Sequence, residues 1–364
     1  MPRTAIALMM AAALAAAAQD AAAQAPKPFK LGTFSRAGNE FVGIVLDDAK
    51  IIDLAPALAA YDKKDPSKRS RAPVDMKDLI TRYDSELKAK IYAIVADAAA
   101  ASAFTYAVKD VKTLPPVRAA IILNGGGNYM EHSAGIAAEQ ARQTGGAAPA
   151  ASPAPVAKSA PGIWTRKEGD PRPENPYLFF KSPTIVIANG EQIRVPKDRD
   201  RIDFECEFNT VIGKTAKRVP AANALDYVFG YTIQIDVSDR GGRGDRKMGG
   251  SDWLVGKNHD TFAPLGPWIT PKEFMKDPNN VRHRFTLNDT VMQDSNTSRM
   301  THNVQELIEY ATNILTLSPG DIISGGSPAG TNIERAEPRW MRAGDTASCA
   351  IEGIGTLTHP VVAE

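Results

Sequence analysis

Three acidic residues occupy every second position in the segment DFECEF: Asp203, Glu205 and Glu207. Successive side chains of a β-strand point to opposite faces, so these carboxylates would share one face and the apolar residues between them the other. No lysine or arginine stands between the acids, and a divalent cation would relieve their repulsion. Oxygen ligands suit hard ions such as Mg²⁺, Mn²⁺ or Ca²⁺. The alternative is the solvated face of an antiparallel sheet.

Asp236 extends this pattern, because it follows a second apolar strand, YTIQI. On a neighbouring strand it would supply a third carboxylate to an octahedral site, whose other positions water and substrate would fill. The five histidines are scattered, and no His or Cys cluster has the spacing of a zinc site. The glycines Gly125 to Gly127 lack the GxGxxG spacing of a dinucleotide-binding loop.

The composition is that of a folded protein without a strong charge bias. The 364 residues include 43 basic and 42 acidic side chains, which give a net charge of +1, and 43% are hydrophobic. This balance would attract neither a nucleic acid nor an anionic membrane, and we expect neither as a partner. Cys206 and Cys349 are the two cysteines, so one disulfide is possible, but the sequence does not establish that they pair.

The first 23 residues have the features of a secretory signal peptide. Arg3 precedes an apolar run of about 14 residues, and the small residues Ala21, Ala22 and Ala23 follow it. The run is too short to cross roughly 30 Å of hydrocarbon easily. The alternative is an alanine-rich disordered tail. We therefore expect a periplasmic or secreted protein that has no membrane association once the signal is removed.

Two domains are predicted after this segment. Residues 28–54 alternate between apolar and polar types, which predicts a small antiparallel sheet, and residues 75–108 have helical spacing of apolar residues. The pair Pro115-Pro116 marks a linker. We therefore expect a small N-terminal domain over 27–115 and a second domain over 117–361.

The second domain is predicted to consist mainly of short strands. Its one amphipathic helix is expected at 301–315, and the Ala- and Pro-rich segment 143–161 is expected to be a flexible loop. The fold class predicted for the chain is therefore α+β, mostly β.

Several motifs in this domain occur together and in order: GGGNYMEH, PYLFFKSPTIVI, DFECEFNTVIGK, YTIQIDVSDR, DWLVGKNHDTFAPLGPWIT, MQDSNTSRM, LSPGDIISGGSPAG and IEGIGTL. With them, the chain resembles the fumarylacetoacetate hydrolase (FAH) family over 117–361. The resemblance implies an FAH-type β-roll of packed mixed sheets, with the active site at its mouth. It also implies a homodimer, a small 2-oxo or diketo acid as substrate, and Mg²⁺ or a similar ion (Mn²⁺ or Ca²⁺).

The resemblance assigns roles to particular residues of this chain. Glu205, Glu207 and Asp236 match the metal ligands, whereas Asp203 matches a recurrent acid without a defined role. Two cations, Lys257 and Arg240, match residues that face the substrate and would stabilise negative charge. The residues expected to bind the substrate are Tyr129, Ser327 and Arg243.

His132 matches the family's general base, but its surroundings differ from the family pattern. In many members a glutamate three residues later assists the histidine, whereas Gly135 stands at that position here. The candidates for a replacement acid are Glu139 on the same segment and Glu334 or Glu337 in a late loop. The family motif DVSARD is also altered, to DVSDRG.

Three functions follow from this reading. The first is a metal-dependent hydrolase that cleaves a C–C bond in an acylpyruvate or 1,3-diketone-type 2-oxo acid, which needs a base that activates water. The second is a decarboxylase or isomerase of 2-oxo or 2-hydroxy-diene diacids, for which stabilising an enolate is sufficient; the segment SNTSRM mildly favours it. The third is a non-catalytic binding protein with a degenerate site, against which the intact metal and lysine positions argue.

Overall fold

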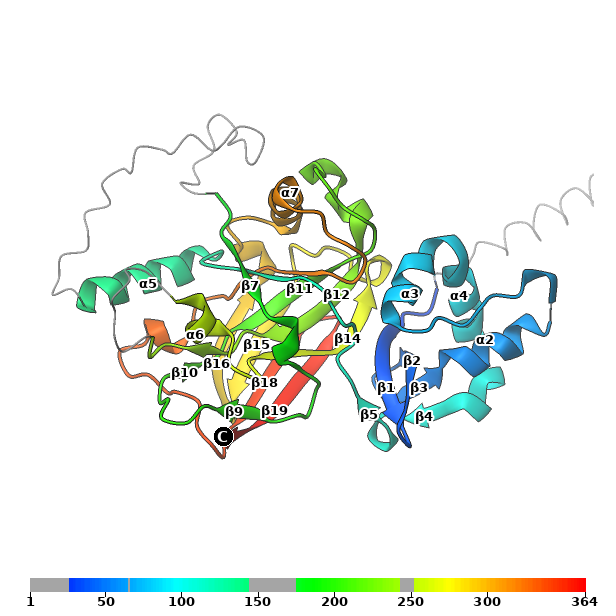
Figure 1. The fold of residues 1–364 in the computed structure, drawn as a ribbon, viewed down its shortest axis with the longest axis horizontal. Coiled ribbons are helices and arrows are strands. Elements are labelled where there is room, and N and C mark those ends of the chain that lie inside the picture. Colours follow the sequence, from blue (N-terminus) through cyan, green and yellow to red (C-terminus); the bar gives the residue numbers. More distant parts are fainter. Residues whose placement is uncertain (1–25, 65, 144–174, 243–251) are drawn as a thin grey trace, which may run out of the picture.

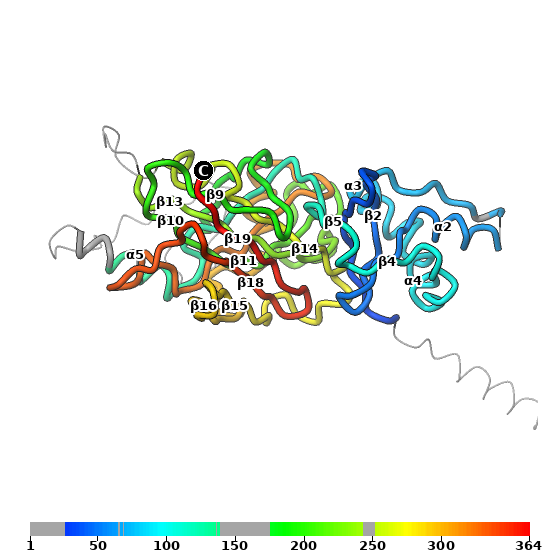
Figure 2. Tube along the Cα trace, turned by 90° about the horizontal axis from the view of Figure 1, so that it is seen from below, coloured from blue at the N-terminus to red at the C-terminus, as the bar shows by residue number. Residues whose placement is uncertain are grey.

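The computed structural model describes residues 26–64, 66–143, 175–242 and 252–364. Its fold is α+β and mostly β, as the sequence predicts. Figure 1 shows a large body of packed sheets beside a smaller N-terminal part, and Figure 2 shows the two parts end to end. The predicted signal peptide and nearly all of the predicted flexible loop lie outside the described residues. Within these residues, no helix has both the length and the apolar character needed to cross a membrane.

The N-terminal part is an antiparallel sheet covered by helices. Its strands are β1 (Lys30–Arg36), β2 (Asn39–Leu46), β3 (Lys50–Asp53) and β4 (Thr105–Ala107). The predicted antiparallel pairing of the first three strands is confirmed. The helices are α2 (Leu54–Asp62), α3 (Met76–Arg82) and α4 (Lys88–Ala96).

The helix predicted to continue to residue 108 ends at Ala96, so its predicted end is wrong. A short 3₁₀ segment follows, and Thr105–Ala107 then pairs with the edge of β3 as strand β4. A β-branched residue and an aromatic residue in this segment favour a strand wherever a sheet edge is available. The helical region is also interrupted by a π-helical turn over Tyr83–Leu87.

A single 12-stranded sheet runs through both parts, with the main order β4-β3-β2-β1-β14-β12-β11-β17-β6-β7. Strand β1 pairs with β14 through Leu31 and Ile269, so the N-terminal part and the body share one sheet. The remaining strands of this sheet are β5 (Lys112–Thr113), β6 (Ile122–Gly125), β7 (Leu178–Lys181), β8 (Val186–Ile187), β11 (Cys206–Ile212), β12 (Val228–Ile235), β14 (Ala263–Pro271) and β17 (Ile322–Ser324).

A second sheet of five strands packs against this sheet. Its order is β16 (Thr290–Asn296), β15 (Arg282–Leu287), β18 (Thr346–Ile351), β19 (Gly355–Ala363) and β9 (Ile193–Val195). Phe204 stacks on Phe285 of β15 with 4.3 Å between ring centroids, and both rings are fully buried. A disulfide joins Cys206 of β11 to Cys349 of β18. The apolar face of the DFECEF segment therefore packs toward the second sheet, as its alternation predicts.

The helices of the body are α5 (Met130–Gln143), α6 (Trp253–Lys257) and α7 (Val304–Ile314). The predicted helix at 301–315 is confirmed as α7. It begins at a capping box in which the Asn303 side chain accepts from the amide of Glu306, while the Glu306 side chain accepts from the amide of Asn303. A two-stranded pair, β10 (Ile202–Asp203) with β13 (Ser238–Asp239), completes the body.

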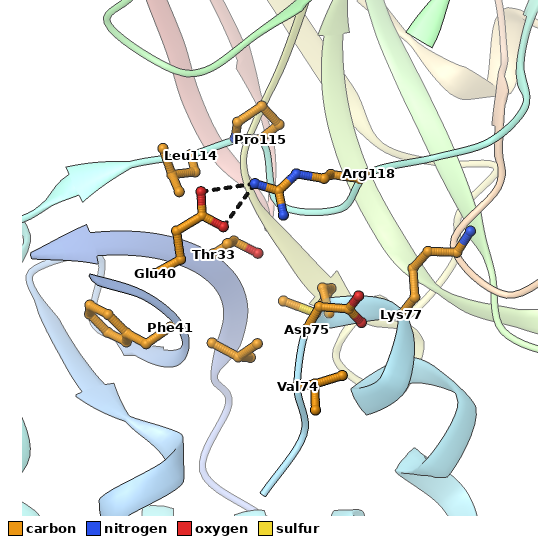
Figure 3. A pocket seen from close by; sticks show the side chains of 11 residues that line it. Thr33, Glu40, Phe41, Val74, Asp75, Lys77, Leu114, Pro115 and Arg118 are labelled. Carbon is orange, nitrogen blue, oxygen red and sulfur yellow. Dashed lines mark hydrogen bonds and ion pairs between the residues drawn. The ribbon is translucent and has the colours of Figure 1, made fainter. Parts of the chain in front are cut away.

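A small pocket of about 90 Å³ lies where the N-terminal part meets the linker before β6. Figure 3 shows that Arg118 reaches across it toward Glu40, and its Nη2 donates to both carboxylate oxygens at 2.8 and 2.9 Å. The pocket is also lined by Thr33, Phe41 and Val74. None of its lining residues is a predicted site residue, so this pocket is separate from the acidic cluster.

The disulfide should contribute substantially to stability. It closes a loop with a sequence separation of 143 residues, and constraining a loop of this size in the unfolded chain is worth about 5 kcal/mol. We expect the double variant Cys206→Ala, Cys349→Ala to lose that amount in urea unfolding. Dithiothreitol should lower the stability of the wild type toward that of the variant and leave the variant unchanged. Equal stability of the two oxidised proteins would contradict the prediction.

Candidate metal centre and active site

The sheet register brings the acids from two strands together. Glu207 lies on β11 opposite Gln234 of β12, and the amide of Asp236 donates to the carbonyl of Glu205 at 2.8 Å. Glu205, Glu207 and Asp236 are all buried, and one carboxylate oxygen from each lies within 4.8 Å of the others. Among the described residues, this is the one group of His, Cys, Asp or Glu side chains arranged to hold a metal ion.

Two buried lysines and a partly buried arginine surround this carboxylate triad. Lys257 Nζ donates to Glu205 Oε2 at 2.6 Å and to Asp236 Oδ2 at 2.7 Å. Lys181 Nζ donates to the other oxygen of Asp236, and Arg240 Nη2 donates to Glu205 Oε1 at 2.6 Å. No lysine or arginine stands between the acids in the sequence, and the fold brings these cations to them from distant segments.

Glu207 is the one member of the triad that forms no ion pair with these cations. Its Oε2 accepts from Asn124 Nδ2 at 2.7 Å and from the Ser324 hydroxyl. Its Oε1 is buried and has no hydrogen-bond partner among the described residues. Burial raises the pKa of Glu207 well above its ordinary value, and the charges of Asp236 and Glu205 raise it further. A divalent cation would supply the missing positive charge, so the triad fits a hard divalent ion.

The other acid and base groups of the site are held at shifted pKa values. Burial alone would raise the pKa of Glu205, but Lys257 and Arg240 outweigh it and hold that pKa below its usual range. Burial lowers the pKa of Lys181, whereas for Lys257 the carboxylates of Asp236 and Glu205 outweigh burial and raise the pKa. Glu205 is therefore ionised, and Lys257 is charged, at neutral pH.

Asp203 is separated from the triad because the predicted single strand is interrupted. Strand β10 ends at Asp203 and β11 begins at Cys206. Asp203 Oδ2 accepts from Arg240 Nε at 3.1 Å, and its Oδ1 accepts from the amide of Asn332 at 2.9 Å. Asp203 therefore connects Arg240 to the loop that carries Glu334.

His132 lies between the triad and this late loop. It is 3% exposed, its Nε2 is 3.7 Å from Glu205 Oε1, and its Nδ1 contacts Glu334 Oε1 directly. Glu334 is fixed in turn by the amide of Gly330 at 2.7 Å and by the hydroxyl of Thr331 at 3.0 Å. An ionised Glu334 accepts the proton on Nδ1, which leaves Nε2 as the basic nitrogen facing the triad.

Gly135 provides the space for this pair. A Cβ at position 135 would lie 2.4 Å from Glu334 Cγ, which is closer than real Cβ atoms approach, and 3.1 Å from Glu334 Cβ. The glycine that stands three residues after His132, in place of the family's glutamate, therefore makes room for the glutamate that the late loop supplies. Sequence reasoning favoured Glu139 and Glu337 and named Glu334 as a further candidate, whereas the structure pairs His132 with Glu334.

The structure locates some of the other predicted site residues. Glu337 is exposed, whereas the side chain of Glu139 and the whole of Arg243 lie outside the described residues. Tyr129 is fully buried and its hydroxyl lies 3.3 Å from His283 Nε2. Ser327 accepts from Gln293 Nε2 at 2.9 Å. Substrate contacts for these residues stay predictions.

Comparison with known proteins identifies the family. The model of the C-terminal domain of fumarylacetoacetate (FAA) hydrolase matches residues 150–362, more than half of the chain. The chain belongs to the fumarylacetoacetate hydrolase family. Its fold, with packed mixed sheets, is therefore the FAH fold that the motifs predict.

Relatives in this family include several kinds of enzyme. A mitochondrial oxaloacetate tautomerase of Xenopus laevis is 38% identical over 192 residues, 53% of this chain but only 60% of that protein. The structure of 5-carboxymethyl-2-hydroxymuconate delta-isomerase from Mycobacterium smegmatis superposes with a TM-score of 0.61 and 29% identity, over 92% of this chain and 99% of that chain.

A third relative carries a metal. The structure of maleylpyruvate hydrolase from Sphingobium sp. SYK-6, in complex with a manganese(II) ion and pyruvate, has a TM-score of 0.63 and 25% identity, over 92% of this chain and 99% of that chain. Together with the buried triad, these relatives support a metal-dependent FAH-type enzyme.

Lys181, Asn124 and Ser324 contact the triad, but sequence reasoning did not single them out. Lys181 had a recognisable signal, because a lone lysine in the apolar strand YLFFKS shares a strand face with Phe179, which is buried. Asn124 and Ser324 had none, since a single polar residue at a strand end is common.

The raised pKa of Glu207 predicts how metal binding depends on pH. A metal ligand must be deprotonated, so binding releases the proton of Glu207 and affinity rises as pH increases toward that pKa. We expect the Mn²⁺ affinity to rise about tenfold per pH unit in this range. Calorimetry in buffers of different ionisation enthalpy measures the proton release. Glu207→Gln should abolish binding, whereas Glu86→Gln in the N-terminal part should leave the profile unchanged. A pH-independent affinity without proton release would contradict the assignment.

Proposed function

We propose that this protein is a hydrolase that cleaves the C–C bond of an acylpyruvate or a related 1,3-diketo 2-oxo acid. Mg²⁺ or Mn²⁺ held by Glu205, Glu207 and Asp236 is the proposed cofactor. The observation that carries the proposal is the pair of His132 and Glu334, because His132 Nε2 faces the triad at 3.7 Å. A bound divalent cation would act as a Lewis acid on the two chelating oxygens of such a substrate.

His132 and Glu334 supply the base that hydrolysis needs. His132 Nε2 takes a proton from water as the water oxygen adds to the acyl carbonyl carbon. The bond between that carbon and the methylene of the pyruvate unit then breaks, leaving a carboxylic acid and pyruvate, and the proton passes to the methylene carbon. Glu334 stabilises the imidazolium that forms in between, as it holds Nδ1.

Lys257 and Arg240 supply positive charge where negative charge develops. Both contact Glu205, so their charged groups lie at the edge of the triad and are fixed before a substrate arrives. Preorganised cations in a buried site stabilise an oxyanion more than they would in water. We assign Arg240 and Lys257 to the substrate carboxylate and to the developing enolate.

A second candidate is keto–enol tautomerisation of oxaloacetate. It is favoured by the tautomerase of Xenopus laevis, which is 38% identical over its matched part. The same base would move a proton between carbon and oxygen, without adding water. Product analysis by NMR separates the candidates, with Mg²⁺- or Mn²⁺-loaded protein and either acetylpyruvate or enol-oxaloacetate. Acetate and pyruvate indicate hydrolysis, the keto isomer indicates tautomerisation, and carbon dioxide indicates decarboxylation.

The base assignment predicts the effect of removing either member of the pair. His132→Ala should lower kcat for hydrolysis at least about 100-fold, the usual worth of a positioned base. Glu334→Gln should lower it about tenfold or more, because the imidazolium loses its counter-charge. Metal affinity by calorimetry should stay the same in both. Glu337→Gln, in the same loop but exposed, is the matched control and should keep full activity. Fast hydrolysis in His132→Ala would refute the assignment.

Gly135 offers a test that leaves both members of the pair in place. Gly135→Ala puts a Cβ against Glu334 and should lower kcat about tenfold, in line with Glu334→Gln. Its thermal stability should change little, because alanine favours a helix over glycine by about 1 kcal/mol and offsets the local clash. Gly256→Ala is the control, since an added Cβ there meets nothing closer than 3.6 Å. Unchanged kcat in Gly135→Ala would argue against a catalytic role for Glu334.

A further inference from the structure

Asp239 is a buried carboxylate next to the site that the proposed chemistry does not use. It ends β13 and is 4% exposed. Its Oδ1 accepts from the amide of Gly241 at 2.8 Å, and its Oδ2 accepts from Arg199 Nε and contacts His259 Nε2 at 3.1 Å. Burial alone would raise the pKa of Asp239, but His259 and Arg199 outweigh it and hold the pKa below its ordinary value. Asp239 is therefore ionised, and its contacts join its own segment to those that carry Arg199 and His259.

These contacts fix the segment that carries Arg240. Arg199 Nη2 donates to the carbonyl of Gly242 at 2.8 Å, and the amide of Arg240 donates to the carbonyl of Arg201 at 2.9 Å. An added Cβ at Gly241 would lie 2.8 Å from Arg199 Nη2 and 3.0 Å from Asp239 Oδ1. The turn after Arg240 is thus packed directly on the ion pair of Asp239 and Arg199.

The same carboxylate reaches the segment that carries Lys257. His259, its second partner, lies two residues after Lys257, in the stretch that follows α6. Ser238, the residue before Asp239, accepts from Lys257 Nζ at 2.8 Å. Asp239 therefore bridges the two chain segments whose cations meet on Glu205.

We propose that Asp239 is a positioning residue that, through Arg199 and His259, holds Arg240 and Lys257 on the Glu205 carboxylate. The inference rests on the proposed function only in that these cations are the ones assigned to the substrate. Arginine and lysine side chains lose much rotamer freedom when fixed, so a site that needs both in place gains from a rigid backbone beneath them.

Hydrogen exchange tests whether Asp239 fixes the segment that carries Arg240, without any assay of activity. In Asp239→Ala, the amides of Arg240 and Gly241 should lose protection by about tenfold or more, while amides in β15 stay protected. Arg199→Gln, at a side chain that is 26% exposed, should have the same local effect and is a second variant if Asp239→Ala does not fold. Asp62→Asn is the control, a buried carboxylate in the N-terminal part that also holds a lysine and a backbone amide. Unchanged protection at Gly241 in both site variants would overturn the proposal.

Oxalate binding to the Mn²⁺-loaded protein tests whether the contacts of Asp239 strengthen ligand binding at the site. Asp239→Ala should weaken oxalate binding about fivefold or more in the wild type, but less than about twofold in the Arg240→Ala background. The effects should not add, because Asp239 acts on oxalate through Arg240. Mn²⁺ affinity should stay within about twofold, since the contacts of Asp239 are to Gly241, Arg199 and His259 and not to a triad carboxylate. Additive effects of the two substitutions would overturn the proposal. Failure of the wild type to bind oxalate would instead refute the proposed substrate class, and hydrogen exchange would then decide on Asp239.

Discussion

The charge balance around Glu205 and Asp236 is the constraint on which the rest of the site depends. Taking carboxylates out of water costs several kcal/mol each unless partners replace the lost hydration. Glu205 receives Lys257 and Arg240, and Asp236 receives Lys257 and Lys181. Glu207 receives only neutral donors, and one of its oxygens is unpartnered among the described residues. The deficit of positive charge is therefore located at one carboxylate, which is where an added cation is most strongly attracted.

Two glycines in this site have the same function. Gly135 leaves the space that Glu334 fills beside His132, and Gly241 leaves the space that Arg199 fills beside Asp239. In both places the motif departs from the family pattern and a side chain from elsewhere in the chain occupies the vacated volume. At Gly135 that side chain is the carboxylate that His132 needs, whereas at Gly241 it is the guanidinium that pairs with Asp239.

The sequence predicted what depends on local pattern. Alternation along DFECEF placed Glu205 and Glu207 on one face, and amphipathic spacing located α7, because periodicity and burial are coupled within a single element. Contacts between distant elements were not accessible in this way. The pairing of His132 with Glu334 and the approach of Lys181 to Asp236 depend on how β7, α5 and the late loop pack. The break between β10 and β11 also depends on pairing with β13, so the continuous strand predicted through Asp203 and Glu207 is wrong.

The pairing of β1 with β14 gives the N-terminal part a role in keeping the body soluble. Strand β14 lies next to β12, at whose end Asp236 stands, and Ile269 of β14 pairs with Leu31 of β1. Without the N-terminal strands, this part of β14 would become an open edge, with free amides and carbonyls and a buried apolar face exposed. Such edges recruit strands from other molecules and lead to aggregation. The N-terminal part thus acts as an edge cap for the catalytic sheet, and trimming the chain to residues 150–362 would remove that protection.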